Sequence, residues 1–266
     1  MTRRYALIGD PVDHSLSPVL QNGWIADHAL DATYETMQLK SDDPVAAIRG
    51  LTQFAGMNVT VPYKDAAARA ADRSEDATAN VLRWEADGSL SAFNTDGLGF
   101  LDSLDEAEPE WRERVRCALI VGAGGAARGI VSALSPHVET LIVVNRTRAH
   151  ADALAAATPR AQSLDWTGLR RAFSEADLIV QTTTLGMTGR TSPDWPVEAC
   201  KAQAIVADIV YRPLETPLLA AAREKGLRTV DGLGMLIHQG ARAFEIWFGV
   251  RPSTVAARTR LEAALA

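Results

Sequence analysis

The feature that most constrains the fold is a glycine-rich segment, VGAGGAARG, at residues 121–129. An apolar run precedes it and alanine-rich sequence follows it, which predicts a strand, a tight turn and a helix. Gly122, Gly124 and Ala127 occupy a G-x-G-x-x-A frame. In such a frame the first glycine permits the turn, the second lets the backbone approach a pyrophosphate, and the small third residue lets the helix pack closely on the sheet. The segment predicts dinucleotide binding, with a purely structural turn as the alternative.

The residues around and after this turn alternate between predicted strands and predicted helices. The predicted strands are CALIVG (117–122), TLIVVN (140–145), ADLIVQTT (176–183) and AIVADIVY (204–211). The predicted helices are GAARGIVSALS (125–135) and RAHADALAAAT (148–158). Strands that alternate with helices imply a parallel sheet with crossover connections. We therefore expect an α/β domain with a Rossmann-like parallel sheet.

The first half of the chain is also predicted to mix strands and helices. Two predicted strands span 5–10 and 32–39, and a third β-rich run at 57–64 is stopped by Pro62. Residues 80–97 are predicted to form a hairpin that turns at Asp87-Gly88. The predicted helices span 44–54 and 64–79, and another begins at Ser17-Pro18 with Ser17 as N-cap and proline at N1. Residues 253–266 are predicted to form an amphipathic helix, which must pack on another part of the protein because isolated helices this short are marginal.

Composition argues against several classes of partner. The formal net charge of −6 and the pI of about 5.4 argue against a nucleic-acid binder. No apolar run approaches the ~18 residues of a membrane helix, and the N-terminal MTRRYALIGD is predicted to be a strand rather than a signal peptide. The five histidines show no metal-ligand spacing, so no metal is expected. Cys117 and Cys200 form no C-x-x-C pair, which fits packing roles in a reduced, cytoplasmic environment.

The end of the second strand in the predicted parallel sheet indicates which cofactor binds. It reads Asn145-Arg146-Thr147-Arg148, where NAD-binding folds carry an acid that accepts a hydrogen bond from the ribose 2′-hydroxyl. NADP has a phosphate at that place, and guanidinium groups bind phosphate through paired hydrogen bonds. Arg146 is therefore predicted to hold the 2′-phosphate of NADP, and a solvated arginine at a strand end is the alternative.

Two polar clusters in the first half of the chain are candidates for ligand binding and chemistry. Ser15 and Ser17 follow the first predicted strand, where paired hydroxyls at a helix start can bind a carboxylate, although Ser17 can equally be only a helix cap. Lys64 follows Asn58 and Thr60 on one predicted strand-to-helix turn. Lysine is rare in this chain, with four among the 27 basic residues, which makes Lys64 a better candidate.

Asp96 lies at the predicted end of the hairpin, within NTDG. A lysine beside an aspartate can transfer a proton when neither group is fully solvated. Lys64 and Asp96 are therefore a candidate catalytic pair, and an ordinary surface ion pair is the alternative. The charged, helix-like segment 102–116 that follows is the predicted boundary between two domains.

Several motifs together resemble a known family. The segments SLSP, NVTVPYK, NTDG, GAGGAARG, NRT, DIVYRPLETPLL and DGLGMLIHQGARAFEIWFG occur in the order found in shikimate dehydrogenases, and they extend over essentially the whole chain. The resemblance implies an N-terminal α/β substrate domain of residues 1–101 and 238–266 and a Rossmann-like, parallel-sheet NADP-binding domain of residues 102–237. The C-terminal helices then return to the first domain, which gives the tail its packing partner.

The resemblance also implies roles for individual residues. It implies that Lys64 is catalytic with Asp96 as its partner. The substrate-binding residues would be Ser15, Ser17, Thr60, Asn80, Tyr211 and Gln239. The cofactor-binding residues would be Gly122, Ala123, Gly124, Gly125, Ala126, Asn145, Arg146, Thr147, Arg148, Ile209 and Gly232.

The chain departs from the family pattern at three places that the resemblance puts near substrate or nicotinamide. Gln21 replaces a histidine, Val81 replaces a threonine, and QTTTLGM at 181–187 replaces a commoner N-A-T-S-x-G-M. The expected reaction is hydride transfer between NADPH and 3-dehydroshikimate, with no nucleic-acid or membrane partner, in a monomer or homodimer. Two alternatives stay open: a quinate/shikimate dehydrogenase with broader substrate or NAD use, and a non-catalytic NADP-binding sensor.

Overall fold

The computed structural model describes residues 2–74 and 76–265, which divide into two compact units. Unit 1 consists of the residues up to Asp96 and those from Ile237 onward, and unit 2 consists of Gly97–Leu236. Three positions of the predicted first domain lie outside the described residues: Met1, Glu75 in the predicted helix 64–79, and Ala266 in the predicted tail helix.

The chain passes from one unit to the other inside helices. The first passage is at the start of α4 (Asp96–Ala107), and the second lies within α10 (Gly232–Phe248). The predicted boundary after residue 101 falls inside α4, and the one after residue 237 falls inside α10. Because both passages are helical, no glycine- or proline-rich linker marks them in the sequence.

Unit 1 is built on a six-stranded sheet, sheet A, whose strand order is β2-β1-β3-β5-β6-β4. Besides most of α10, its elements are β1 (Arg3–Gly9), α1 (Ser17–Asp27), β2 (Ala32–Gln38), α2 (Pro44–Arg49), β3 (Gly56–Val59), α3 (Lys64–Ala70), β4 (Arg73–Ser74), β5 (Val81–Trp84), β6 (Leu90–Phe93) and α11 (Thr254–Leu265). β1 runs parallel to both β2 and β3, which lie on opposite sides of it. In open α/β sheets, ligands bind beside the carboxyl ends of strands at such a change of direction.

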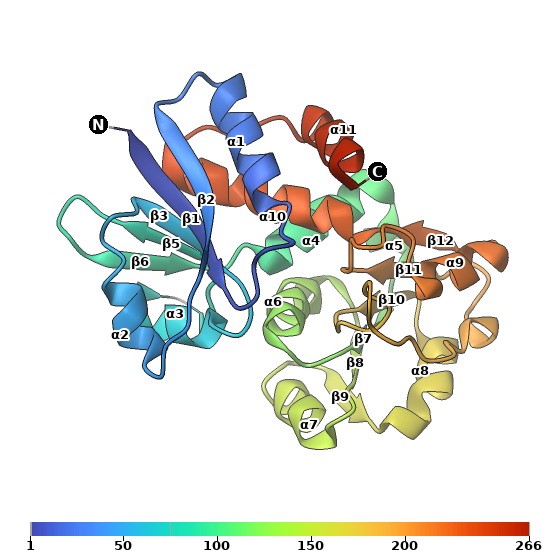
Figure 1. Ribbon diagram of the computed structural model, residues 1–266. Helices are drawn as coiled ribbons and strands as arrows, with labels where there is room; N and C mark the ends of the chain where they lie inside the picture. Colours follow the sequence, from blue (N-terminus) through green and yellow to red (C-terminus); the bar gives the residue numbers. More distant parts are fainter. Residues whose placement is uncertain (1, 75, 266) are drawn as a thin grey trace. The chain divides into compact units, whose positions relative to one another are not determined.

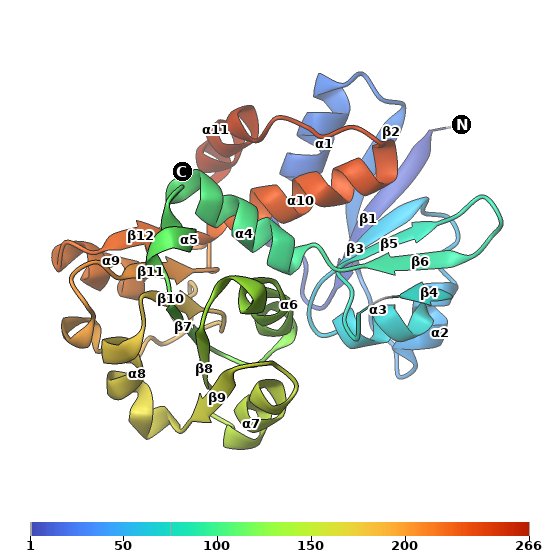
Figure 2. The ribbon, with the colours of Figure 1, turned by 180° about the vertical axis from the view of Figure 1, so that it is seen from behind.

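Helices cover both faces of sheet A (Figures 1 and 2). Ala6 and Ile8 of β1 belong to the core that α2 and α3 cover, whereas Tyr5 packs on Trp247 of α10 with ring centroids 5.0 Å apart. This alternation is what a strand with two buried faces requires. The tail helix α11 packs against α1, so the prediction that the tail packs on another part of the protein is confirmed.

Unit 2 is built on a six-stranded, fully parallel sheet, sheet B, in the order β12-β11-β10-β7-β8-β9. After α4, its elements are α5 (Trp111–Arg114), β7 (Cys117–Val121), α6 (Gly125–Leu134), β8 (Thr140–Val144), α7 (Arg148–Ala156), β9 (Ala161–Leu164), α8 (Leu169–Glu175), β10 (Leu178–Gln181), β11 (Ile205–Asp208), α9 (Pro217–Glu224) and β12 (Arg228–Val230). The predicted Rossmann-like sheet is confirmed, and its change of direction lies between β7 and β10.

Alternate residues of each central strand in sheet B enter different cores. On β7, Ala118 and Ile120 pack with α4 and α6, whereas Leu119 and Val121 pack with α8 and α9. Both faces of a crossover-connected sheet are covered by helices, which is why its strands read as continuous apolar runs. No helix among the described residues is long and apolar enough to cross a lipid bilayer.

The predicted capping role of Ser17 is wrong. Leu16 occupies the N-cap of α1 without a side-chain cap, and Ser17 lies inside the first turn. The Ser17 N–H donates to Ser15 Oγ at 3.1 Å, so the neighbouring serine satisfies a backbone group that a capping side chain would otherwise bind.

Two predicted helices end earlier than expected, and three strands were missed: β4, β9 and β12. α2 ends at Arg49, where Gly50 follows, because glycine is a poor helix residue. α3 ends at Ala70 because residues 73–74 pair with β6, and Arg49 supports this by donating to the Ala70 carbonyl oxygen at 2.6 Å. The missed strands β9 and β12 lie at the two edges of sheet B, where short and partly exposed sequences give no continuous apolar run.

Candidate active site

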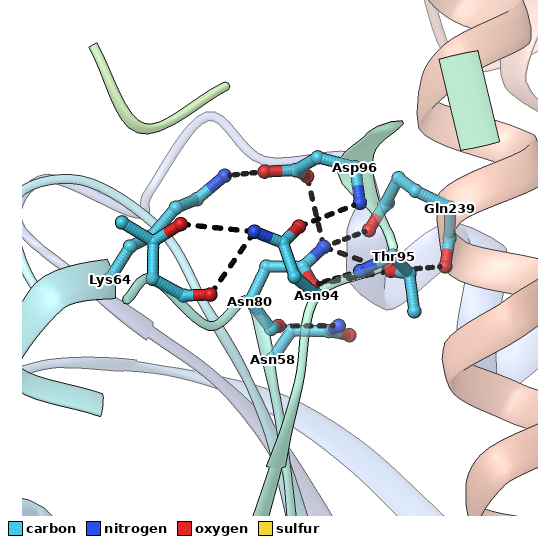
Figure 3. A network of polar contacts seen from close by, with 8 residues as sticks. Asn58, Lys64, Asn80, Asn94, Thr95, Asp96 and Gln239 are labelled. Carbon is cyan, nitrogen blue, oxygen red and sulfur yellow. Dashed lines mark hydrogen bonds and ion pairs between the residues drawn. The ribbon is translucent and has the colours of Figure 1, made fainter. Parts of the chain in front are cut away.

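Lys64 and Asp96 lie in a largely buried polar network of unit 1 (Figure 3). Lys64 Nζ pairs with Asp96 Oδ2, and the two side chains are 14% and 5% exposed. Lys64 is the first residue of α3 and Asp96 the first residue of α4, so each begins a helix just after a strand of sheet A. The pair is therefore not a solvated surface ion pair, and water screens it much less than an exposed one.

Asn80 connects this pair to α10. Its Nδ2 donates to Asp96 Oδ1 at 2.9 Å and to Gln239 Oε1 at 3.2 Å, and its Oδ1 accepts from the Thr95 N–H at 2.7 Å. Thr95 Oγ1 donates to the Gln239 carbonyl oxygen at 3.1 Å. α10 is thus attached to the network through both a side chain and its backbone. Thr95 is not among the predicted site residues, and its place beside Asp96 in NTDG is the signal that could have found it.

The two serines lie beside the same network. Ser15 Oγ donates to Ser17 Oγ at 3.1 Å, and the Ser17 hydroxyl lies close enough to the Tyr34 phenol to lower its pKa. The Tyr34 hydroxyl donates to Asn58 Oδ1 at 2.7 Å, and Asn58 Nδ2 donates to the Asn80 carbonyl oxygen at 3.2 Å. Hydrogen bonds therefore extend from Tyr34 to Asn80, and the serine pair lies next to the Tyr34 end of this chain.

Tyr34 holds the middle of this chain. Burial raises the pKa of its phenol well above the usual value, and the nearby Ser17 hydroxyl opposes that shift only in part, so the Tyr34 hydroxyl stays protonated. Asn22 of α1 fixes the Tyr34 backbone, since its Nδ2 donates to the Tyr34 carbonyl at 2.8 Å and its Oδ1 accepts from the Tyr34 N–H at 2.9 Å. Tyr34 was missed because an aromatic residue in an alternating strand looks like core.

Thr60 completes the predicted set on unit 1. It is half-buried after β3, and its N–H donates to the Ile8 carbonyl oxygen at 2.9 Å, which places it beside the end of β1. The structure thus gathers seven predicted residues around the carboxyl ends of β1 and β3 and the starts of α3 and α4. These residues are Ser15, Ser17, Thr60, Lys64, Asn80, Asp96 and Gln239. Tyr211 belongs to unit 2, and its role stays a prediction.

In unit 2, the glycine turn between β7 and α6 fits a dinucleotide. Gly122 has φ +122°, and a Cβ at this position would clash with Thr182, so only glycine suits it. Gly124 is the N-cap of α6, and a Cβ there would meet no described atom within 4 Å. The unpaired N–H groups at the start of α6 therefore have room for a phosphate beside them. Ala127 is 0% exposed, so its small side chain lets α6 pack on the sheet.

The two arginines after β8 differ in their surroundings. Arg146 is exposed and makes no hydrogen bond or ion pair with any residue that the structure describes. Arg148 pairs with Asp152 at 2.7 Å and with Asp165 at 2.8 Å, and the hydrogen bonds that it donates to these carboxylates raise its pKa. Thr147 is the N-cap of α7, without a side-chain cap bond. Arg146 is thus the better placed of the two arginines for an added phosphate.

Ile209 and Gly232 are brought together at the carboxyl end of sheet B. Gly232 starts α10, and a Cβ at this position would clash with the Ile209 carbonyl group. The Ile209 N–H donates to the Gln181 carbonyl oxygen at 3.1 Å. The close approach explains the glycine at 232 without a ligand, so contact of either residue with a cofactor stays a prediction.

Each departure from the family pattern has a buried residue, although most of QTTTLGM is only partly buried and Thr184 is exposed. Gln21 is 1% exposed and its Nε2 donates to the Gly240 carbonyl oxygen at 3.1 Å, which joins α1 to α10. Val81 and Gln181 are each 0% exposed, Val81 in the core of unit 1 and Gln181 in a hydrogen-bonded cluster of unit 2. Each therefore has a packing or hydrogen-bonding role inside its unit.

The arrangement can hold and move a proton. A lysine ammonium beside a buried carboxylate can donate a proton to a carbonyl oxygen, and Asp96 is fixed for this purpose by Asn80. Among the described residues, no group of histidine, cysteine, aspartate and glutamate side chains is placed to hold a metal ion. Cys117 and Cys200 are unpaired and lie in or against the apolar core of unit 2, as packing residues would.

Comparison with known proteins accounts for most of the chain. Residues 7–82 match the shikimate dehydrogenase substrate binding domain, residues 108–209 match shikimate/quinate 5-dehydrogenase, and residues 232–262 match the shikimate 5′-dehydrogenase C-terminal domain. A shikimate dehydrogenase (NADP⁺) of Dinoroseobacter shibae is 42% identical over 92% of this chain and 92% of its own. A shikimate dehydrogenase (NADP⁺) of Rhodospirillum rubrum is 44% identical over 92% of this chain and 92% of its own length.

Solved structures give the same answer. The shikimate 5-dehydrogenase of Thermus thermophilus, crystallised with NADP(H) and shikimate, is 33% identical. It matches 99% of this chain and 100% of its own with a TM-score of 0.88. With relatives this similar over nearly its whole length, the chain belongs to the shikimate dehydrogenase family.

Proposed function

We propose that this protein interconverts 3-dehydroshikimate and shikimate with NADP as cofactor. The observation that carries the proposal is the Lys64–Asp96 pair, which unit 1 holds in a hydrogen-bonded network next to the paired serines Ser15 and Ser17. NADPH, when bound, supplies the hydride for the ketone carbon. The protein must then bind the substrate, orient it and supply the proton.

Lys64 supplies the proton. Its ammonium donates to the carbonyl oxygen as that oxygen gains charge, and in the reverse direction the neutral amine accepts the proton from the hydroxyl. Asp96 orients the ammonium through Oδ2 while Asn80 holds Oδ1 at 2.9 Å. With both oxygens engaged, the carboxylate is fixed before substrate binds, which favours catalysis because little reorganisation is left for the reaction.

Ser15 and Ser17 bind the substrate carboxylate. Their hydroxyls lie 3.1 Å apart and can both turn toward an anion. Thr60, Asn80 and Gln239 take the ring hydroxyls. Tyr211 of unit 2 adds a contact to the carboxylate.

The cofactor is held by unit 2. The turn at 122–126 and the start of α6 bind the pyrophosphate, and Arg146 binds the 2′-phosphate with Asn145, Thr147 and Arg148 around it. Ile209 and Gly232 contact the nicotinamide end. The Asn145 Nδ2 group donates to the Thr147 carbonyl oxygen at 2.9 Å, which joins the two sides of Arg146 in this loop.

The test is the rate of NADPH oxidation with 3-dehydroshikimate, compared with 3-dehydroquinate and with NADH in place of NADPH. We expect turnover with NADPH and 3-dehydroshikimate and at least about tenfold lower kcat/KM when either is replaced. Equal efficiency with 3-dehydroquinate or NADH would support the broader dehydrogenase instead. NADPH binding without turnover of either ketone would support the sensor.

The unpaired Cys117 and Cys200 fit a reduced cytoplasmic location. The protein acts as a monomer or homodimer. Its mass in solution, measured by light scattering, distinguishes the two states.

A further inference from the structure

Three buried polar side chains lie together at the carboxyl end of sheet B, outside the residues predicted to bind ligands. Gln181 ends β10, Asp208 ends β11 and Thr216 is the N-cap of α9. Their exposed fractions are 0%, 2% and 0%. Asp208 accepts from Gln181 Nε2 at 3.2 Å and from Thr216 Oγ1 at 2.7 Å. We call these three residues the β10–β11 cluster.

The cluster holds two loops. Gln181 Nε2 also donates to the Leu185 carbonyl oxygen at 3.0 Å, and Gln181 Oε1 accepts from the Thr183 N–H, so one side chain fixes the loop after β10. Asp208 Oδ1 accepts from the Val210 N–H at 2.9 Å, which fixes the start of the loop after β11. Thr216 Oγ1 accepts from the Leu219 N–H at 3.3 Å and so joins that loop to α9.

Both loops touch predicted cofactor residues. Thr182, in the loop after β10, donates to the Val121 carbonyl oxygen at 2.8 Å through its hydroxyl, and its side chain lies where a Cβ on Gly122 would be. Ile209 begins the loop after β11, against Gly232. A shift of the β10–β11 cluster would therefore move the neighbours of the glycine turn and Ile209 together.

The cluster is a costly way to stabilise a fold. Asp208 makes no ion pair with any described lysine or arginine, and a buried carboxylate without a cation is less favourable than a well-packed apolar group. Burial raises the pKa of Asp208 to about 6, although three hydrogen bonds act in the opposite direction. The cluster costs stability, yet its polar groups are hydrogen-bonded to one another and to the two loops. We read this as a requirement for a fixed geometry of the loops after β10 and β11.

We propose that Gln181, Asp208 and Thr216 are positioning residues, which set the loops after β10 and β11 so that the glycine turn and Ile209 hold NADP in its reactive place. The inference rests on the proposed function of unit 2 as the cofactor site. None of the three side chains needs to touch the cofactor, because each acts through backbone groups of the loops.

The test compares Thr216→Val with Thr216→Ser in the full-length protein. Valine keeps the shape and removes the hydroxyl, while serine keeps the hydroxyl. Loss of one hydrogen bond to a buried carboxylate predicts about a three- to tenfold higher Kd for NADP, with a similar fall in kcat and little change in the KM for shikimate. Serine should restore both values. Gln181→Leu, which frees the loop after β10 by a different route, should raise the Kd for NADP as well.

A matched control lies at the opposite end of the same sheet. Asp177 accepts from the Cys117 N–H at 2.9 Å and pairs with Lys201, so it joins β7 and β10 at their amino ends as the cluster joins β10 and β11 at their carboxyl ends. Asp177→Asn should lower stability and leave the Kd for NADP unchanged. An unchanged Kd in folded Thr216→Val and Gln181→Leu, or an equal change in Asp177→Asn, would overturn the proposal.

Wild-type protein gives a second measurement, which applies even if a variant does not fold. The Thr183 and Val210 N–H groups donate to the cluster, whereas the Arg116 and Cys117 N–H groups donate to Asp177. In hydrogen exchange, NADP should slow exchange of the first two amides more than exchange of the other two. Equal slowing at both ends of the sheet would refute the inference. Failure of the proposed function would appear separately, as wild-type protein that binds NADP but does not turn over 3-dehydroshikimate.

Discussion

The polar residues of unit 1 and the cofactor residues of unit 2 are built in different ways. In unit 1, side chains bind side chains: Lys64, Asp96 and Asn80 hold one another in a buried network. In unit 2, the glycine turn offers backbone N–H groups, and Arg146 is exposed and unpaired among the described residues. The polar side chains of unit 1 already bind one another, whereas the Arg146 guanidinium of unit 2 has no described partner and is available to bind a phosphate. Substitution of Lys64 or Asp96 in unit 1 should therefore lower kcat, and substitution of Arg146 in unit 2 should weaken the binding of NADP.

The largest expected effect is at Lys64. Lys64→Ala should lower kcat by about 10²–10⁴, the usual contribution of a general acid–base group, while the KM for shikimate changes much less. Lys64→Arg should restore little, because arginine does not lose its proton. Lys40→Ala, at an exposed lysine, is the control and should keep wild-type kinetics. A Lys64→Ala enzyme within about threefold of wild-type kcat would remove Lys64 from the mechanism.

The partnership of Lys64 with Asp96 is tested by a double variant. If the two groups act as a unit, Lys64→Ala combined with Asp96→Asn should cost little more than Lys64→Ala alone. Steady-state kinetics on the two single variants and the double variant give this comparison. Full additivity of the two losses would leave Lys64 in place and break its pairing with Asp96.

The next effect concerns stability and depends on pH. Burial raises the pKa of Asp208 to about 6 from an ordinary 3.8, so the folded state holds a proton that the unfolded state releases between these values. The contribution of Asp208 to stability is therefore complete below about pH 4 and lost as pH rises through 6, by on the order of 2–3 kcal/mol. The free energy of unfolding of Asp208→Asn, compared with that of wild type, should therefore rise as pH increases from about 4 to 6 and stay constant at higher pH.

Urea unfolding of the full-length protein from pH 4.5 to 8 measures this difference. Asp177→Asn is the control of opposite sign. Burial raises the pKa of Asp177, but hydrogen bonds from Lys201 and from the Cys117 and Arg116 backbone lower it more, so the net pKa is below 3.8. The stability that Asp177 contributes is present above that value and is lost only at lower pH. A flat difference between wild type and Asp208→Asn from pH 4.5 to 7 would contradict the raised pKa.

The comparison also explains what could be predicted from the sequence. The glycine turn, Arg146 and the Lys64–Asp96 pair follow local rules of turn, strand end and motif. The structure pairs Lys64 with Asp96 and gives Gly122 a positive φ, while the phosphate-binding role of Arg146 stays a prediction. Tyr34 could not be found, because its role depends on contacts with α1 and β3 that are remote in sequence. The capping prediction for Ser17 failed for a similar reason: the motif allowed a cap, and the neighbouring Ser15 took over part of that role.

Cofactor affinity should fall at Arg146. A hydrogen bond to a charged group is worth roughly 1.5–3 kcal/mol, so Arg146→Ala should raise the KM for NADP by about tenfold or more and leave the KM for NAD nearly unchanged. Arg148→Ala is the matched variant and should have a smaller effect, because Asp152 and Asp165 already engage that guanidinium. Equal losses for NADP and NAD would remove Arg146 from the phosphate site.

The serine pair should affect only the substrate. Replacing Ser15 and Ser17 with alanine should raise the KM for shikimate by at least about tenfold and change the KM for NADP by less than about twofold, since each hydroxyl contributes roughly one hydrogen bond to a carboxylate. Ser17 is not the N-cap of α1, but Ser15 Oγ accepts from the Ser17 N–H at the start of this helix, so the double variant also loses a cap-like bond worth about 1 kcal/mol of stability. Circular dichroism checks the fold, and an unchanged KM for shikimate in a folded variant contradicts the carboxylate role.

The smallest expected effect tests whether the hydrogen-bonded order of unit 1 reaches the serines. Tyr34→Phe removes only the hydroxyl between Ser17 and Asn58 and should raise the KM for shikimate about two- to fivefold, with the KM for NADP unchanged. Tyr5 is the control: it pairs directly with Tyr34 in the β1–β2 register and is equally buried, yet no hydrogen bond joins its hydroxyl to a described residue. Tyr5→Phe should therefore leave both KM values unchanged. Matching kinetics for the two phenylalanine variants would show that the serines are held without Tyr34, and that the ordered network of unit 1 ends at Asn80.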